Sequence, residues 1–240
     1  MPQRVYQLMF NAGEVVEIRG IGGLKGHNKA WEGACFGAKG TVSGYFNNAE
    51  DFGKGAKALD GAGAHGVYFT LNPCLPSLLA RAENRLKANI NNTTDKEVLC
   101  IRWLPIDLDP VRPSGISSTK EELQRAVEVA KTIAGHLEAE RGWAKAVRGF
   151  SGNGYHMLYR LQDPPNEPSQ VVMVRKALAY LDHKFSTEEV KVDTSVYNPA
   201  RIWKVYGTHA RKGDNTKDRP HRLSRLLTKQ KTLSDVGASE

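Results

Sequence analysis

The sequence predicts an α+β fold, and the order of its elements carries the prediction. Between residues 98 and 196, strand-like runs alternate with helical periodicity in the order β-α-β-β-α-β, which is that of a ferredoxin-like sheet. Before residue 98 the segments are shorter and glycine-rich. We therefore expect a single core over residues 1–240, with an N-terminal α/β module over 1–97, a second module over 98–225 and a flexible tail over 226–240.

The N-terminal module is predicted from runs of β-branched and aromatic residues and from apolar residues at helical spacing. A glycine-rich stretch near its start lacks the G-x-x-x-x-G-K-[ST] pattern, so it predicts a hairpin loop and not a P-loop. The expected strands are 15–19, 41–46 and 66–71, and the expected helices cover 52–59 and 78–86.

The second module has clearer sequence signals for the starts and ends of its helices and strands. Ser118 and Thr119, with glutamates three residues later, predict a capping box before a helix. Pro105 falls inside the first strand, where it predicts a bulge. The expected strands are 98–108, 146–150, 155–161 and 190–196, and the expected helices follow the apolar stripes of 123–137 and 171–185.

Two aspartates end the first of these strands. Asp107 and Asp109 are two residues apart, so in a strand they share a face. Their carboxylates repel unless a positive charge lies between them, and Mg²⁺ is usually held by one or two carboxylates together with substrate phosphates. For this pair alone, the other interpretation is a solvated strand end that runs into a turn at Pro110.

The predicted sheet brings further polar residues to the same edge. If the strand 98–108 lies between 190–196 and 155–161, its end lies beside His156 and Asp193. Three aspartates, two divalent ions and a nucleoside triphosphate would make a two-metal phosphoryl-transfer site, in which one ion activates a hydroxyl and the other offsets charge on pyrophosphate. His156 is placed to donate to a phosphate oxygen, with a structural hydrogen-bonding role as the alternative.

The net charge of +8 resides in one segment. Residues 199–231 hold ten Lys or Arg and two acids, and such a concentration indicates a phosphate-bearing partner. Arg201 and Lys204 follow Asp193 closely and are expected to bind a triphosphate. A second set is expected to hold phosphates or template, and its surplus suggests that the core starts chains de novo: Lys212, Arg219, His221 and Arg222.

Several protein classes are excluded. No apolar run is long enough to span a bilayer, and residues 1–6 lack the apolar core of a signal peptide. The three cysteines, Cys35, Cys74 and Cys100, form no C-x-x-C pair, so neither a zinc site nor a disulfide framework is expected. The sequence therefore predicts a cytoplasmic protein with no membrane partner.

Five short motifs together resemble the archaeo-eukaryotic primase superfamily, and above all the primase-polymerases of plasmids, phages and CRISPR loci. The resemblance covers residues from about 66 to 222. The pattern departs in one place, because many members carry Ser two residues before the histidine, where this chain has Gly154, and Ser151 lies five before. The motifs are Asp107-Leu108-Asp109, Ser151-Gly152-Asn153-Gly154-Tyr155-His156, Val192-Asp193, Asn198-Pro199-Ala200-Arg201 and Tyr206-Gly207-Thr208.

The resemblance implies an RRM-like catalytic module packed on the N-terminal module. It also implies a helicase or other replication module on a longer protein. Mg²⁺ or Mn²⁺ would be bound by Asp107, Asp109 and Asp193, and the incoming nucleotide would be contacted by Ser151, Asn153, His156, Arg201 and Lys204.

The expected function is a template-dependent nucleotidyltransferase that makes and extends primers on single-stranded DNA from dNTPs or NTPs. One alternative is a non-catalytic RRM-like nucleic-acid-binding module. Arg148-Gly149-Phe150 begins an RNP1-like motif that Ser151-Gly152-Asn153 breaks, and a binding module needs no three aspartates at one edge. The other alternative, a rolling-circle replication initiator, requires a paired-histidine metal site, and the sequence has no His-x-His.

Overall fold

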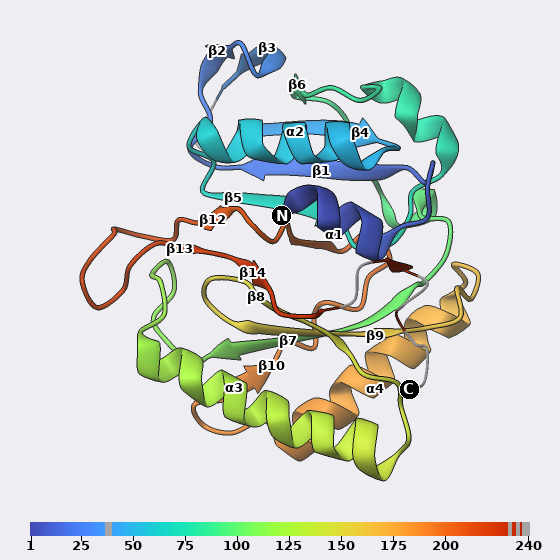
Figure 1. Ribbon diagram of the computed structural model, residues 1–240, viewed down its shortest axis with the longest axis vertical. Coiled ribbons are helices and arrows are strands. Elements are labelled where there is room, and N and C mark those ends of the chain that lie inside the picture. Colours follow the sequence, from blue (N-terminus) through green and yellow to red (C-terminus); the bar gives the residue numbers. More distant parts are fainter. Residues whose placement is uncertain (37–39, 230–231, 234–235, 237–240) are drawn as a thin grey trace.

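A computed structural model describes residues 1–36, 40–229, 232–233 and 236. In this part of the chain, helices and strands form a mixed α+β fold with two large sheets and a small two-stranded one, so the predicted class is confirmed. The two large sheets lie one above the other, with helices on their outer sides (Figure 1). None of the described helices has the length and apolar character needed to cross a membrane.

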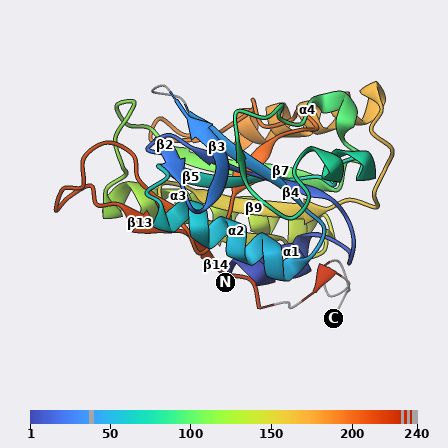
Figure 2. The same cartoon turned by 90° about the horizontal axis from the view of Figure 1, so that it is seen from above.

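The first sheet has seven strands in the order β11-β5-β1-β4-β6-β3-β2. Helix α2 packs on its central strands with α1 beside it (Figures 1 and 2), and aromatic rings from Tyr6, Phe52 and Phe69 fill the layer between them. The bounds are α1 Pro2–Met9, β1 Val16–Ile21, β2 Gly26–Asn28, β3 Trp31–Cys35, β4 Thr41–Phe46, α2 Ala49–Gly61, β5 Gly66–Thr70, β6 Lys87–Ala88 and β11 Ile202–Lys204.

The second sheet has five strands in the order β10-β7-β9-β8-β14. Its first four are the strands predicted for residues 98–196, and they lie in the predicted order. Helices α3 and α4 cover the face that points away from the first sheet (Figure 1). The bounds are β7 Trp103–Pro110, α3 Lys120–Ala134, β8 Val147–Phe150, β9 Tyr155–Arg160, α4 Pro168–Phe185, β10 Val190–Val192 and β14 Arg225–Leu226, with a π-helical turn at Gly135–Glu140.

The capping box before α3 is confirmed. The Thr119 hydroxyl accepts from the Glu122 N–H at 3.2 Å, and the Glu122 carboxylate accepts from the Thr119 N–H at 2.8 Å. These two bonds satisfy backbone donors that a helix start leaves free. Because the cap fixes where α3 begins, it also fixes how the loop after β7 returns to the sheet.

Two predictions about the first strand were wrong. The strand begins at Trp103 and not at residue 98, because Val98 and Cys100 form only isolated bridges to other segments. The bulge at Pro105 is absent, since Pro105 pairs with Leu158 in a continuous register. Strand β10 pairs only with residues 108–110 of β7. At Pro105, β7 therefore has a neighbouring strand on one side and none on the other, and a missing backbone N–H is tolerated there.

Three other boundaries were wrong. The helix expected over 78–86 is a 3-10 turn, Pro76–Arg81, because Ala82 and Asn84 then bond to Tyr45 of β4 and draw the chain into an extended path. Helix α1 was not predicted. The last strand ends at Val192, because the Asp193 carboxylate accepts from the Ser195 N–H and turns the chain.

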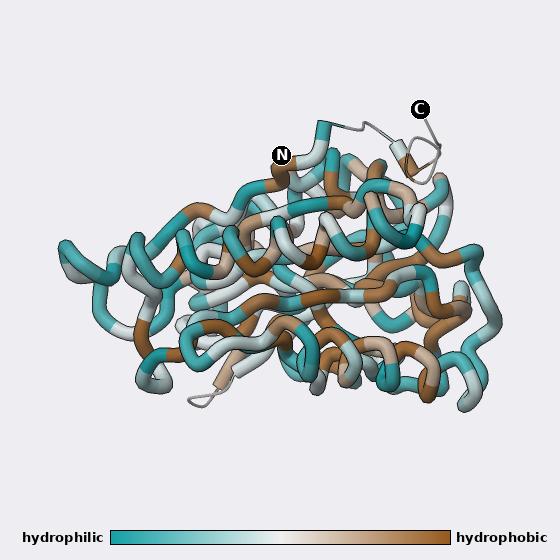
Figure 3. Tube along the Cα trace, turned by 90° about the horizontal axis from the view of Figure 1, so that it is seen from below, coloured by the Kyte–Doolittle hydropathy of each residue, from teal (hydrophilic) through white to brown (hydrophobic). Residues whose placement is uncertain are grey.

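The basic segment joins the two sheets. Residues 202–204, expected in the second module, form β11 at the edge of the first sheet beside β5. The chain continues through the two-stranded β12 (His209–Ala210) and β13 (Arg222–Leu223) and returns to the second sheet as β14. Hydrophobic stretches run through the middle of the fold (Figure 3). Of the expected tail, 230–231, 234–235 and 237–240 lie outside the described residues, whereas Leu226, Leu233 and Val236 are buried in the core.

Candidate active site

A cleft of about 580 Å³ lies between the two sheets. Its walls come from β1 and β5 of the first sheet, β7 and β9 of the second, and the basic segment that joins them. Most of the residues singled out in the sequence line it: Asp107, Asp109, Ser151, Asn153, His156, Asp193, Arg201, Lys204 and Lys212.

The three aspartates line the cleft beside one end of the second sheet. Asp107 and Asp109 lie on the cleft face of β7, while Ile106 and Leu108 point the other way and are fully buried. Asp193 follows the end of β10, and its N–H donates to the Asp107 carbonyl at 2.9 Å. The alternation of side chains along β7 therefore places two carboxylates in the cleft, and the pairing of β10 brings the third beside them.

Gly154 lies directly against this pair. A Cβ at this position would be 2.7 Å from the Leu108 carbonyl oxygen and 2.8 Å from Oδ1 of Asp109. Both contacts are closer than a carbon side chain allows. The glycine two residues before His156, which departs from the pattern of the resembled family, is therefore required by the closeness of the turn to β7.

Ser151 and Asn153 hold that turn in place. The Ser151 hydroxyl accepts from the Gly154 N–H at 2.8 Å. The Asn153 side chain accepts from the Ser118 N–H at 2.9 Å, and the Ser118 hydroxyl donates to the Asn153 carbonyl at 2.6 Å. These bonds tie the turn to the start of α3, so both side chains are engaged within the protein.

The negative charge of Asp107 and Asp109 is only partly neutralised by the positive side chains around them. Poor solvation within the cleft, followed by the charge of Asp107, raises the pKa of Asp109 to about 6. Arg112 offsets this only in part, with its guanidinium 3.6 Å from Oδ1 of Asp109. Oδ1 of Asp107 is buried and accepts no hydrogen bond from any described residue. An excess of negative charge with an unsatisfied oxygen is the environment that a cation would stabilise.

His156 is fixed by two aromatic residues of the basic segment. Its ring lies 4.1 Å from that of Trp203, between centroids, and its Nδ1 is 2.9 Å from the Tyr206 hydroxyl. That hydroxyl already accepts from the Trp203 Nε1–H at 3.1 Å, and complete burial raises the pKa of Tyr206. Tyr206 therefore donates to Nδ1, which places the proton of a neutral His156 on Nε2, 3.4 Å from Oδ1 of Asp107.

The basic side chains of the cleft differ in how far contacts within the protein already occupy their hydrogen-bond donors. The Lys204 ammonium is buried, donates to the His209 carbonyl at 2.6 Å and lies over the Tyr68 ring. Burial, with a smaller contribution from Arg211, lowers the pKa of Lys204 to about 7. Arg201 donates to the Ser195 carbonyl, while its buried Nε has no partner among the described residues. Lys212 is exposed at the cleft wall.

Arg219 and Arg222 lie outside the cleft. The Arg219 guanidinium binds both carboxylate oxygens of Glu122, at 2.8 and 2.9 Å, and Arg222 donates to the Ser118 carbonyl at 2.6 Å. His221 contacts the Gly213 carbonyl of its own loop. Together the two arginines attach the loop between β12 and β13 to the start of α3.

Some residues of the cleft were not expected from the sequence. Tyr68 and His65 come from the N-terminal module, and Arg112 follows β7. In the sequence, Trp203 and Tyr206 stand out only as apolar residues within the basic segment, and Tyr206 also as part of a motif. No local pattern marks these residues, because the two sheets bring them together over long chain separations.

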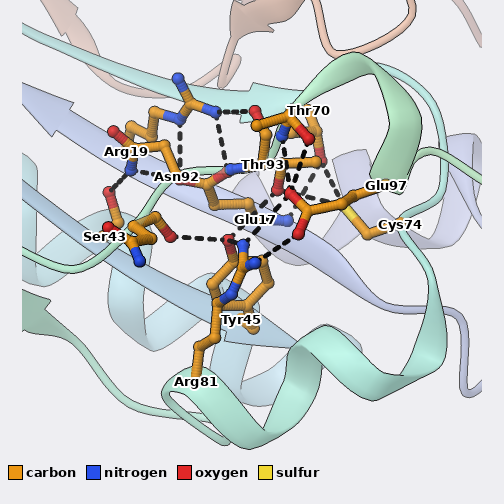
Figure 4. Close-up of polar contacts among 12 residues, drawn as sticks. Glu17, Arg19, Ser43, Tyr45, Thr70, Cys74, Arg81, Asn92, Thr93 and Glu97 are labelled. Atoms are coloured by element: carbon orange, nitrogen blue, oxygen red, sulfur yellow. Dashed lines mark hydrogen bonds and ion pairs between the residues drawn. The ribbon is translucent and has the colours of Figure 1, made fainter.

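A buried polar network centres on Glu17 of β1, one of the strands that contribute to the cleft (Figure 4). The Glu17 carboxylate is fully buried and accepts from Arg19 at 2.7 Å, from the Asn92 side chain at 2.7 Å and from the Thr93 N–H at 2.8 Å. Glu17 and Ile21 lie on the same face of β1, and Ile21 lines the cleft. The network thus fixes the strand from which one wall of the cleft is made.

The donor set was tested against a divalent ion. Within the described ranges, no group of three or more His, Cys, Asp or Glu side chains is close enough to hold a metal by itself. One oxygen of Asp193 is already bonded to the Ser195 N–H. The pair Asp107 and Asp109 does fit, because Mg²⁺ is commonly held by one or two carboxylates with phosphates supplying other ligands.

No protein-family model matches the chain, and no curated protein matches it. Among solved structures, the chain is similar to the primase-polymerase domain of cyanophage S-2L, with 13% identity and a TM-score of 0.49 over 95% of this chain and 88% of that one. It is also similar to primase RepB', with 14% identity and a TM-score of 0.47, covering 95% and 55% of the two chains.

A third similar structure is the polymerase domain of Mycobacterium tuberculosis ligase D in complex with DNA. Here the identity is 15% and the TM-score 0.46, over 92% of this chain and 78% of the other. All three likenesses concern overall fold.

Proposed function

We propose that the chain is a template-dependent nucleotidyltransferase, a primase-polymerase that synthesises and extends primers on single-stranded DNA. The observation that carries the proposal is the carboxylate pair Asp107 and Asp109, which lies unbalanced in a cleft whose other walls carry Arg201 and Lys212. A nucleoside triphosphate with a divalent ion supplies the charges that this arrangement lacks. The second sheet, with α3 and α4, acts as an RRM-like catalytic module.

Asp107 and Asp109 would hold Mg²⁺ or Mn²⁺, and Asp193 would complete the site with its second carboxylate oxygen. When bound, these ions lower the pKa of the attacking 3′ hydroxyl and offset charge on the departing pyrophosphate. No zinc is required by the proposal, and the three cysteines are buried separately as free thiols.

The protein's own residues then position the triphosphate. His156 and Arg201 line the cleft from opposite sheets and would donate to phosphate oxygens, and Lys212 adds charge at its rim. Lys204 contributes less charge than the sequence suggested, because its ammonium is bound to a carbonyl and its pKa lies near 7. Positioning and electrostatic stabilisation are the main requirements of phosphoryl transfer.

The test is incorporation of labelled nucleotide on a single-stranded template, with Mg²⁺ or Mn²⁺, with and without an annealed primer. Asp107→Ala and Asp109→Ala should each abolish incorporation and keep DNA binding, because DNA phosphates are bound by Lys and Arg. Glu188→Ala, an exposed acid outside the cleft, is the matched control and should behave as wild type.

If the wild-type protein binds DNA and incorporates no nucleotide with either ion, the proposal is wrong. The non-catalytic binding module would then be the better description. Equal activity in the wild type and in Asp107→Ala would remove that residue from the reaction.

A further inference from the structure

A second hollow lies on the other face of the second sheet, outside the cleft. It has a volume of about 640 Å³ and opens between α3 and the strands β8, β13 and β14. We call it the α3–β14 groove. It is lined by Lys120, Leu123, Val127, Phe150, Tyr155, His221, Arg222, Leu223, Arg225 and Leu227.

The lining of the groove is mainly apolar and includes exposed leucines. Leu223 and Leu227 are 43% and 49% exposed, whereas the aromatic Tyr155 is 9% exposed. Helices α3 and α4 cover the middle of the sheet and leave this side open, and β14 is the edge strand among the described residues. An exposed apolar surface of this kind is typical of a site that another chain covers.

The positive charge of the groove indicates that its partner carries acidic groups. Lys120, Arg222 and Arg225 line it, and no acidic side chain does. Single-stranded nucleic acid would also match this charge, but it binds by stacking bases on exposed aromatic rings. Here the exposed apolar side chains are leucines, Phe150 is only partly exposed, and Tyr155 is nearly buried.

We propose that the α3–β14 groove binds a peptide segment of a partner protein in which aliphatic residues are flanked by Asp or Glu. The aliphatic side chains would cover Leu223 and Leu227, and the carboxylates would pair with Lys120 and Arg225. The site is independent of the nucleotide cleft, so it stands or falls separately from the proposed catalytic function.

The probe is a fluorescein-labelled twelve-residue peptide with leucine at every third position and Asp or Glu elsewhere. Fluorescence anisotropy should show saturable binding to the full chain. Leu227→Asp and Arg225→Glu, both at exposed positions, should each weaken binding by about tenfold, and hydrogen exchange should slow at residues 222–227 when the peptide is bound. Peptides with Ser in place of Leu, or Lys in place of the acids, should not bind.

The control variants are Val172→Asp and Lys176→Glu, which make the same changes on the exposed face of α4 and should bind the peptide as wild type. Absence of saturable binding, or equal binding by Leu227→Asp, would overturn the proposal. It would also be overturned if the peptide fails and an oligo-dT binds the groove, with Leu227→Asp and Arg225→Glu reducing that binding while the α4 controls do not.

Discussion

At the scale of single residues, the cleft depends on contacts that allow no extra atom. Gly154 is the clearest case, because a side chain there would press on both the Leu108 carbonyl and the Asp109 carboxylate. The backbone of β7 cannot move away without disturbing its pairing with β9. The glycine thus couples the shape of a turn to the position of the carboxylates.

We therefore predict that Gly154→Ser, which would restore the pattern of the resembled family, impairs this protein. The change should lower the free energy of unfolding by about 1–3 kcal/mol and reduce nucleotide incorporation strongly, because Asp109 is displaced. Urea unfolding and primer extension measure the two effects. Gly61→Ala, where no atom lies within 4 Å, is the control and should leave both unchanged; a fully active Gly154→Ser would contradict the assigned contact.

A second prediction concerns the tautomer of His156. Tyr206→Phe removes the donor to Nδ1 and the acceptor of the Trp203 indole N–H, so neutral His156 should lose its preference for a proton on Nε2. Ring ¹⁵N chemical shifts of His156 report this directly. Loss of the hydrogen bond to His156, of about 0.5–1.5 kcal/mol, should slow incorporation by about tenfold at most.

Tyr159→Phe serves as the control for Tyr206→Phe. Tyr159 lies on β9, as His156 does, but its hydroxyl donates to Glu138. Unchanged ¹⁵N shifts of His156 in Tyr206→Phe would show that Tyr206 does not set the tautomer.

At the scale of elements, the basic segment is divided between two tasks. Its first part, with Arg201, lines the cleft, while Arg219 and Arg222 attach the β12–β13 loop to α3. Glu122 is shared, because the same carboxylate caps α3 and binds Arg219. Two of the charges that suggested a second triphosphate pocket, those of Arg219 and Arg222, are thus engaged in contacts inside the protein.

Arg219→Ala should accordingly act on stability more than on nucleotide binding. We expect a measurable loss in the free energy of unfolding, coupled to Glu122→Ala in a double-mutant cycle, with the KM for nucleotide little changed. Arg201→Ala should do the reverse and raise that KM about tenfold or more, as expected for a charge-assisted contact. If Arg219→Ala suppressed dinucleotide formation alone, the loop would have a role in initiation.

At the scale of the whole molecule, β11 holds the two sheets together and carries Lys204 into their interface. The pKa of Lys204 is lowered to about 7 in the folded protein, against an ordinary value of 10.5. Between these two values the unfolded chain binds more protons than the folded one, so stability should rise with pH there. Below pH 7 both states are protonated, and the full cost of burying the charge remains.

Lys204→Met removes this pH dependence. Between pH 7 and 9, the wild-type free energy of unfolding should gain about 1–3 kcal/mol relative to the variant. Urea unfolding at the two pH values measures the difference, and the variant serves as the reference for all other titrating groups. Parallel pH curves for the two proteins would show that Lys204 is not buried as a charged group.

The sequence by itself determined four strands of the second sheet, their order and the face of the sheet on which Asp107 and Asp109 lie, beside His156 and Asp193. These follow from local signals, namely apolar alternation, a capping box and turn residues, together with the few topologies open to six elements. The boundaries at Trp103 and Pro76–Arg81 were missed because pairing partners distant in the chain set them, whereas the boundary at Val192 is set by the turn in which Asp193 accepts from the Ser195 N–H.

Only the tertiary structure decided which charges face the cleft. Arg201, Lys204, Arg219 and Arg222 look equivalent in the sequence, and their roles depend on whether a carbonyl or carboxylate from another element reaches them first. The same holds for Trp203, which lines the cleft, and Tyr206, which contacts His156, because β11 crosses to the first sheet. Periodicity fixes the face on which a side chain lies, whereas its neighbours across a cleft depend on how whole layers pack.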